Sequence, residues 1–462
     1  MNATVPDIEH WRARLADIAT RHAIPGVVLA ISHGDELIEV AHGVLNVNTG
    51  VETTADSLFH LGSITKVWTA TLAMRLVEQG MIGLDTPLRE VLPELRLADP
   101  ATAERITLRH LLIHTGGLDD PVIDTGRGDD CLARFVTALA DSEPAHPLGE
   151  TWAYSNGGFC LAGRVIEVLT GQTWDAAMRD MLFEPLGLGH TVTLPEDALL
   201  HRAAVGHMPG ADGTPQRVDS WLFRPRYVAP AGYISASARD VLTFARMHLD
   251  GGVAPSGERL LSAESVALMQ SEQVVLPYSG WTADSWGIGW WRADWRGERV
   301  IGHGGATLGQ SAQLWVLPGH RLSFVVLTNT GDDIGTAVQE LSAEIAQALA
   351  GVTAPRPFGP PETPAEVEMT GHLGVYQAPL YRAEVTAGPD GPRLRQTLLG
   401  VAAELMPDPV QEYALVPLDA NRFAAQEIKS GRWMPGAFEE LSDGWYLSCG
   451  GGIAHKIESG VA

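Results

Sequence analysis

Hydrophobic residues recur along the N-terminal part of the chain with two different periods. Residues 7–22 carry apolar side chains at three- and four-residue spacing, the pattern of an amphipathic helix. The run 27–32 is apolar up to its last residue, Ser32, and is followed, after a short polar turn, by 37–44, so the pair predicts a β-hairpin. Helical spacing returns from Thr69 onward, in a helix that begins near Ser63. A helix, a hairpin and a second helix in this order indicate an α+β fold.

Helical and strand patterns alternate through the next part of the chain. Further helices are predicted over 106–118, 159–169, 174–183, 241–249 and 334–349, and strands over 286–291, 299–306, 314–317 and 323–329. The segment 334–349 closes this series and is expected to pack beside the first helix. We therefore assign residues 1–351 to one α+β domain.

A change of composition marks a second domain. Residues 352–365 are rich in proline, which predicts an extended linker. Residues 366–462 show short alternating strands with glycine and proline turns and little helix. That pattern predicts a small antiparallel β-barrel.

Composition and charge narrow the classes of function. The 462 residues carry 32 Lys and Arg against 56 Asp and Glu, a net charge of −24, and 45% are hydrophobic. A large packed core is therefore feasible, whereas an acidic surface repels nucleic acid and anionic membranes. Residues 1–18 lack a secretory signal and no apolar run is long enough to be a membrane span, so we expect a cytoplasmic protein.

Cysteine and histidine give little indication of a metal site. Cys131, Cys160 and Cys449 are too few and too scattered for a disulfide framework or a zinc site. His110 and His114 lie one helical turn apart, a spacing that can bind metal, but no third ligand stands near them in sequence. We interpret both as structural histidines and expect no metal or cofactor.

Ser63 and Lys66 are the first candidates for chemistry. Positions i and i+3 of a helix share a face, so both side chains should point the same way. Serine becomes nucleophilic when a neighbour removes its proton, and a lysine whose charged form is disfavoured by burial can be that neighbour. Free N–H groups in the first helical turn would favour developing negative charge. The alternative is a solvated serine–lysine pair without a catalytic role.

Three motifs downstream accompany this pair: Tyr154-Ser155-Asn156, Pro230-Ala231-Gly232 and His303-Gly304-Gly305. A tyrosine with a pKa near about 10 is a weak base at neutral pH, but a nearby cation such as Lys66 would favour its phenolate. Taken singly, Tyr154 could be a buried aromatic, Asn156 a helix N-cap and His303 a strand residue with a hydrogen-bonded ring. Those interpretations do not account for the whole ordered set.

With the 106–118 segment, these motifs in this order resemble the penicillin-binding-protein and class C β-lactamase superfamily of serine acyl enzymes (peptidase S12-like). The resemblance covers residues 8–350. It implies a β-lactamase/transpeptidase-like α/β sandwich, in which an antiparallel sheet is flanked by helices and accompanied by an all-helical subdomain.

The resemblance also implies a role for each motif residue. Ser63 would be the acylated nucleophile, Lys66 the group that helps to deprotonate it, and Tyr154 a base or proton shuttle to the leaving group. Asn156 would bind a substrate amide and orient Lys66. The backbone N–H groups of Ser63 and Ala306 would form the oxyanion hole. Substrate contacts are expected at Trp152, Gly232, Gly304 and Gly305.

His303 departs from the superfamily pattern, because β-lactamases and carboxypeptidases have a lysine there that holds a substrate carboxylate. Histidine is mostly neutral at neutral pH. The substitution therefore disfavours penicillin hydrolysis. Histidine is common at this position in the esterases, D-aminopeptidases and acyltransferases of the superfamily, and the resemblance therefore places His303 among the expected catalytic residues.

The barrel segment, with Gly374-Val375-Tyr376 near its start, resembles the lipocalin-like domain of some superfamily members. Together with the 124–130 loop it is most like the penicillin-binding-protein-type thioesterases, which release nonribosomal peptides from a carrier protein. These usually close a ring head to tail and favour a D-residue at the acylating end. The expected function is therefore a peptide cyclase that acts on a carrier-bound peptidyl thioester, with His455 and Lys456 as candidate contacts from the barrel. A D-aminopeptidase, esterase or β-lactamase-like hydrolase is the alternative, and an inactive peptide-binding sensor is a remote one.

Overall fold

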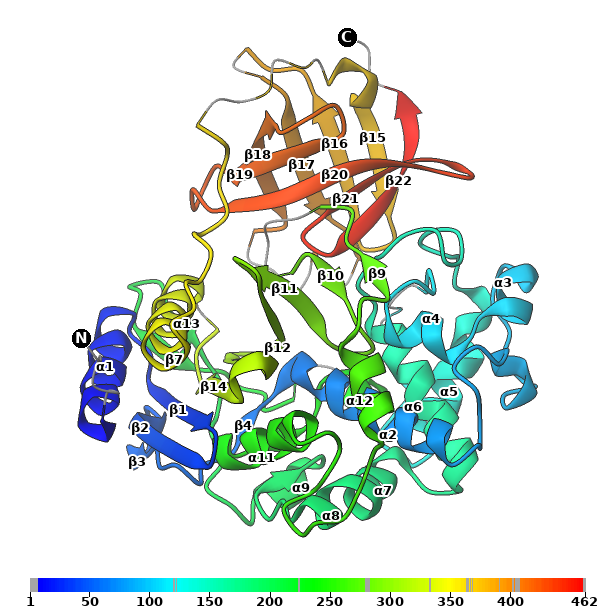
Figure 1. Ribbon diagram of the computed structural model, residues 1–462. Coiled ribbons are helices and arrows are strands. Elements are labelled where there is room, and N and C mark those ends of the chain that lie inside the picture. Colours follow the sequence, from blue (N-terminus) through cyan, green and yellow to red (C-terminus); the bar gives the residue numbers. More distant parts are fainter. Residues whose placement is uncertain are drawn as a thin grey trace.

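The chain forms an α/β domain that ends with helix α13 (Gly335–Ala350) and a β-barrel that follows it (Figure 1). No helix or strand is assigned among the described residues between α13 and residue 370, which include most of the expected linker. The computed structural model describes residues 7–118, 121, 123–222, 225–278, 283–331, 334–362, 365, 367, 369–389, 391–400, 403 and 408–459.

An antiparallel sheet forms the centre of the first domain. Across the described residues its nine strands run in the order β3 (Val51–Glu52), β2 (Glu36–Asn46), β1 (Gly26–His33), β14 (Leu322–Thr328), β13 (Gln310–Leu317), β12 (Glu298–Thr307), β11 (Trp291–Trp295), β10 (Ser285–Trp286) and β9 (Val274–Val275). A smaller sheet joins β4 (Phe59–His60), β8 (Ser235–Ala236) and β5 (Thr191–Val192).

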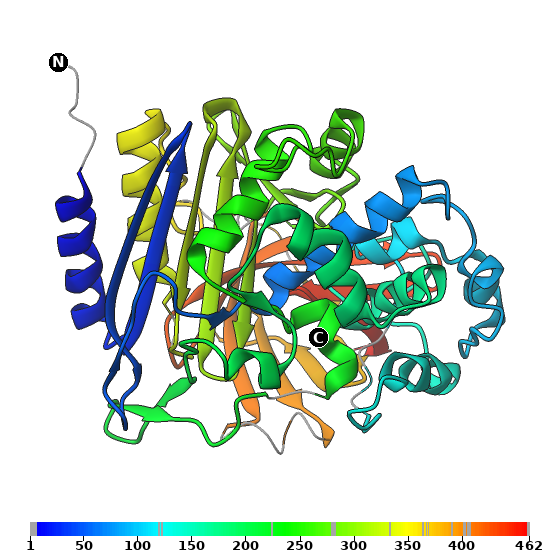
Figure 2. The same cartoon turned by 90° about the horizontal axis from the view of Figure 1, so that it is seen from below.

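Strand β1 is buried on both faces, because helices cover the sheet on both sides. Val28 and Ala30 belong to the core shared with the helical subdomain, whereas Val27, Leu29 and Ile31 belong to a second core with α1 (Ile8–Arg21) and α13. Figure 2 shows α1 and α13, in blue and yellow, on the opposite side of the sheet from the green helices. An ion pair between Arg14 and Glu344 (2.8 Å) links α1 to α13, so the predicted packing of the first and last helices is confirmed.

The remaining helices build the all-helical subdomain and the cover of the sheet. They are α2 (Thr65–Glu78), α3 (Pro100–Arg105), α4 (Leu108–Leu112), α5 (Cys131–Ala138), α6 (Asn156–Thr170), α7 (Trp174–Met178), α8 (Glu184–Leu186), α9 (Pro195–Ala198), α10 (Ala229–Gly232), α11 (Ala238–Leu249) and α12 (Ala263–Gln270). No described helix combines the length and the apolar character that a membrane crossing requires.

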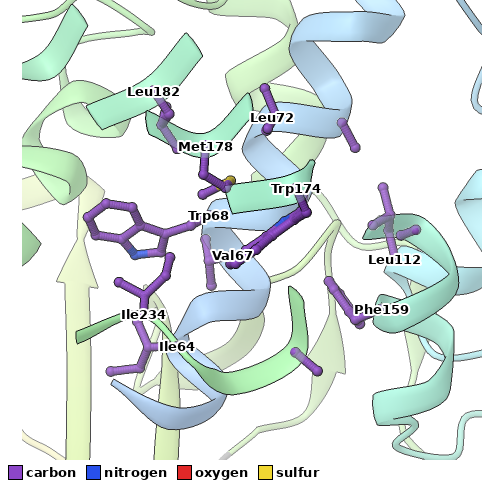
Figure 3. Close-up of a cluster of buried hydrophobic side chains, with 14 of the residues drawn as sticks. Ile64, Val67, Trp68, Leu72, Leu112, Phe159, Trp174, Met178, Leu182 and Ile234 are labelled. Atoms are coloured by element: carbon purple, nitrogen blue, oxygen red, sulfur yellow. The ribbon is translucent and has the colours of Figure 1, made fainter. Parts of the chain in front are cut away.

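Helix α2 lies in the middle of this packing and is buried along most of its length. Its Val67, Trp68 and Leu72 lie among side chains of several surrounding segments (Figure 3). The indole of Trp68 stacks on Phe244, with ring centroids 4.1 Å apart and an interplanar angle of 11°. Because α2 is held on several sides, the residues at its start have fixed positions.

The second domain is a closed barrel whose strands follow one another in sequence. Within the described residues its eight strands are β15 (Gly374–Ala378), β16 (Tyr381–Thr386), β17 (Arg393–Leu398), β18 (Val410–Pro417), β19 (Arg422–Glu427), β20 (Trp433–Leu441), β21 (Gly444–Cys449) and β22 (Gly452–Ser459). Strand β22 pairs with β15 and closes the ring. The expected α+β domain with a lipocalin-like antiparallel barrel is therefore confirmed.

Two local predictions are wrong. The segment 286–291 is not one strand, since a turn separates β10 from β11 and its Gly289 (φ +78°) lies against α2, where a Cβ would be 2.8 Å from that of Ala70. The predicted helix 106–118 is limited to α4. His114 has φ +61°, a left-handed conformation that cannot continue a right-handed helix.

Gly163 allows α6 to lie directly against α10. A Cβ at this position would be 2.3 Å from Cγ of Pro230, so Gly163→Ala should force the two helices apart. We expect the free energy of unfolding, measured by urea denaturation, to fall by about 1–3 kcal/mol. Gly158→Ala is the matched control in the same helix, because its Cβ would approach its neighbours no closer than 3.5 Å. Equal losses in both variants would contradict this close helix contact.

Candidate active site

Ser63 lies in a short helical turn (Gly62–Ile64) immediately before α2, and its side chain is half-buried. Strand β12 passes directly against this turn. A Cβ on Gly305 would be 1.9 Å from the carbonyl oxygen of Leu61 and 2.8 Å from the backbone nitrogen of Ser63, and one on Gly62 would be 2.6 Å from the nitrogen of Ala306. Glycine at both positions therefore brings the N–H groups of Ser63 and Ala306 close together, as an oxyanion hole requires.

Lys66 has no solvent exposure, and its Nζ is surrounded by oxygen atoms from distant segments. Nζ donates to Oγ of Ser63 (3.1 Å), to Oδ1 of Asn156 (2.8 Å) and to the carbonyl oxygen of Ala231 (2.9 Å). The last two oxygens only accept, whereas the serine hydroxyl can also donate. With two N–H groups held in this way, a neutral Lys66 can direct its lone pair at Ser63 and take the hydroxyl proton.

Helices α6 and α10 supply these two acceptors. Asn156 is the first residue of α6, and the N-cap is Ser155, whose side chain accepts from the nitrogen of Gly158 (2.9 Å). The alternative interpretation of Asn156 as the helix N-cap is therefore wrong. Its amide oxygen faces Lys66 instead, as a residue that orients the lysine would.

Tyr154 lies beside the lysine in an extended segment before α6. Lys66 Nζ is 4.7 Å from the centre of the phenol ring. The imidazole of His114 stacks on the ring of Tyr154, with centroids 4.4 Å apart and an interplanar angle of 27°. Its Nδ1 accepts from the nitrogen of Ser155 (3.0 Å), and its carbonyl oxygen accepts from the nitrogen of Ala153 (3.0 Å). His114 therefore holds the segment on both sides of Tyr154, a role that no sequence pattern indicated.

His303 is buried and does not act as a cation. Its Nδ1 must donate to the carbonyl oxygen of Gly304 (2.6 Å), which leaves Nε2 without a proton and without a hydrogen bond to any described residue. Burial, reinforced by the nearby positive charge of Lys66, lowers the pKa of His303 to about 3. The position that carries a lysine in the β-lactamases and carboxypeptidases is therefore neutral in this chain.

A pocket with a volume of about 220 Å³ opens over Ser63. Among the described residues, its lining is His60, Ser63, Tyr154, Asn156, Trp221, Leu222, Val228, Ala231, Gly232, Tyr233, Ala306 and Thr307. None of these residues is an acid, a lysine or an arginine. Gly232, an expected substrate contact, is part of this lining. Trp221, Leu222 and Val228 were missed, because Trp221 and Leu222 lie in an irregular segment and Val228 in a short helical turn, neither of which shows a periodic pattern.

Some residues expected at the substrate lie elsewhere. Trp152 is 2% exposed and packs against Trp286 (5.1 Å), behind Tyr154 rather than in the pocket lining. Gly304 and Gly305 are on β12 beside Ala306 but outside the lining. In the barrel, Lys456 donates to the carbonyl oxygen of Gly371 and His455 lies against Tyr446, so neither candidate contact reaches the pocket. Trp152, Lys456 and His455 thus contact other parts of the protein and do not line the pocket.

The two histidines considered as metal ligands have other partners. Nδ1 of His110 accepts from the backbone nitrogen of Thr107 (3.1 Å) at the start of α4, while His114 contacts the Tyr154 segment. Within the part of the chain that the structure describes, no three histidine, cysteine or acidic side chains gather as metal ligands would.

The chain belongs to the beta-lactamase family, whose profile matches residues 11–349. It is thus a serine hydrolase of the β-lactamase and penicillin-binding-protein class. Penicillin-binding protein 4 of Amycolatopsis lactamdurans is 44% identical over 375 residues, which cover 80% of this chain and 98% of that protein. Esterase EstB of Burkholderia gladioli is 32% identical over 222 residues, which cover 43% of this chain and 53% of the esterase.

Solved structures extend the comparison to the barrel. SurE superposes with a TM-score of 0.79 at 28% identity, over 97% of this chain and 99% of SurE. A class C β-lactamase of Rhodobacter sphaeroides superposes with a TM-score of 0.60 at 25% identity, over 73% of this chain and 99% of the enzyme. SurE therefore shares the two-domain arrangement, whereas the β-lactamase matches about the extent of the first domain.

Gly305→Ala tests the contact between β12 and the Ser63 turn. The added Cβ would meet backbone atoms of Leu61 and Ser63, so one oxyanion donor should be displaced. We expect kcat with an activated ester to fall about 10²–10³-fold. Gly304→Ala is the matched control, since its Cβ would meet the flexible end of the Gln313 side chain. A loss in Gly304→Ala as large as that in Gly305→Ala would contradict this explanation.

Buried histidines should make stability depend on pH. Burial lowers the pKa of His60 to about 4 and those of His248 and His303 to about 3, and it holds the pKa of His114 well below its usual value. In the unfolded chain these rings titrate near about pH 6.5. Below that pH the unfolded state binds protons that the folded state does not, so stability decreases as the pH falls toward 4.

Each such ring should contribute a slope of up to about 1.4 kcal/mol per pH unit. Urea unfolding at intervals from pH 7.5 to 4.5 measures the total. His248→Gln removes one ring that lies away from Ser63, with its Nε2 at Thr71 (3.0 Å), and should reduce the slope by about that amount. A stability that does not change between pH 6.5 and 4.5, or an unchanged slope in the variant, would contradict the prediction.

Proposed function

We propose that the protein releases a peptide from a carrier-bound thioester by acylating Ser63, and that the peptide's own amine then closes a ring. The observation that carries this proposal is the pocket over Ser63, whose described lining contains no acid, lysine or arginine. A penicillin or a peptide with a free C-terminus presents a carboxylate near the scissile bond, and the neutral His303 offers it no cation. A peptidyl thioester has no carboxylate at that end, so it fits this site.

The first half of the reaction uses the groups around Lys66. Lys66 takes the proton from Ser63 while Oγ attacks the thioester carbonyl, and the N–H groups of Ser63 and Ala306 bind the resulting oxyanion. The intermediate then collapses, the carbon–sulfur bond breaks, and the thiolate leaves with a proton from Tyr154. The products are acyl-Ser63 and a free thiol.

In the second half, the amine at the other end of the peptide attacks acyl-Ser63. Tyr154, next to Lys66, accepts the amine proton, and the Ser63 oxygen leaves with a proton returned through Lys66. Ring closure competes with hydrolysis when the amine is held close, and such orientation contributes up to about 7–11 kcal/mol. The apolar wall of Trp221, Leu222 and Val228 would help by displacing water.

One further observation supports a D-residue at the acylating end and a two-domain enzyme of this kind. SurE has been solved with D-Leu, and that structure matches 97% of this chain with a TM-score of 0.74. The net charge of −24 disfavours nucleic acid as an alternative partner.

Hydrolysis by the same acyl enzyme is the second candidate, and the similarity to Esterase EstB favours it. The hydrogen bonds of Lys66 to Ser63 and to Asn156 argue against an inactive peptide-binding protein, because they place the nucleophile beside its base.

Product masses distinguish these functions. We expect a peptidyl pantetheine thioester with a C-terminal D-residue to give a product one water lighter than the linear acid, and its L-epimer to react much more slowly. Mass spectrometry measures both products, and Ser63→Ala is the control for uncatalysed hydrolysis. Linear acid alone, from thioester and from D-alanine anilide, would establish a hydrolase instead of a cyclase.

A further inference from the structure

The segment that carries Tyr154 is held by the barrel as well as by its own domain. Along this extended segment, the amides of Ala153 and Ser155 point to His114, whereas the amide between them points the other way. The nitrogen of Tyr154 donates to the carbonyl oxygen of Gly451 (3.0 Å), in the turn that joins β21 to β22. Figure 1 shows this end of the barrel facing the β9–β10 side of the large sheet.

The Gly451 residue is itself fixed from the first domain. Its nitrogen donates to the phenol oxygen of Tyr278 (2.7 Å), a residue that is 2% exposed and follows β9. Gly451 has φ +87°, a conformation that glycine adopts without strain. The turn thus lies between two tyrosines. The carbonyl oxygen of Gly451 accepts from the backbone nitrogen of Tyr154, and its N–H donates to the phenol oxygen of Tyr278.

Other contacts of the barrel gather along the same segment. Oγ1 of Thr151 donates to Oε2 of the half-buried Glu439 (2.6 Å), and Ala153 packs with Tyr446 and Ile453. A separate contact, between Ser442 and Glu150 (2.6 Å), lies at the exposed surface. The barrel therefore contacts the chain from Glu150 to Tyr154 rather than the pocket itself.

We propose that the β21–β22 turn positions Tyr154 for proton transfer, so that this turn of the barrel supports catalysis in the first domain. His114 and Gly451 hold opposite edges of the segment, and the phenol between them has to serve both acylation and ring closure or hydrolysis. Tyr278 is a positioning residue, since it acts on Tyr154 through Gly451. The inference rests on acylation of Ser63 but not on the fate of the acyl group.

Tyr278→Phe tests the inference with little change of shape. It removes the oxygen that accepts from Gly451, which should loosen the turn and its bond to Tyr154. We expect faster hydrogen exchange in the 152–158 peptide and slower acylation by p-nitrophenyl butyrate, by about ten- to a hundredfold. The pH dependence of kcat/KM should also move, whereas a purely structural defect would reduce the folded fraction and leave the pH profile unchanged.

Ser442→Ala is the matched control, because it removes a barrel contact at the exposed surface. It should acylate at the wild-type rate. Wild-type rates and an unchanged pH profile in Tyr278→Phe would overturn the inference, as would equal losses in both variants. If Tyr278→Phe does not fold, Gly451→Ala strains the same turn and should give the same kinetic changes. Failure of wild-type protein to be acylated would instead contradict the proposed function.

Discussion

Lys66 places an amine where solvent does not reach, and the rest of the site depends on the oxygens around it. A buried ammonium is costly unless its protons are matched by acceptors. Those acceptors come from the Ser63 turn, from Asn156 at the start of α6 and from Ala231 in α10. Folding therefore brings these segments together to satisfy one side chain, and the same contacts place the nucleophile beside its base.

Close backbone approach is the second requirement. Glycines at 62 and 305 let β12 run against the Ser63 turn, and Gly163 lets α6 meet α10. Each is a place where an added methyl group would meet backbone or ring atoms. The site is thus fixed by packed secondary structure, and the barrel adds a bond to the backbone of Tyr154. His303, whose pKa burial lowers to about 3, lies outside the described lining of the pocket.

Much of the fold could be predicted from the sequence, because hydrophobic periodicity and proline content report local structure and domain limits. The motifs also identified the Ser63, Lys66 and Asn156 positions that the fold brings together. The features that the sequence did not predict are those that depend on contacts between distant segments. The pocket wall around Trp221 lies in an irregular segment, the burial of Trp152 depends on Trp286, and the roles of His114 and Gly451 depend on hydrogen bonds between distant segments.

The most direct test of the central claim is the intact mass of the protein after a brief reaction with a peptidyl thioester, followed by peptide mapping. We predict one acyl group on the oxygen of Ser63, and no such adduct in Ser63→Ala. An unmodified wild-type protein that still consumes the thioester, or an acyl group that persists in Ser63→Ala, would contradict it.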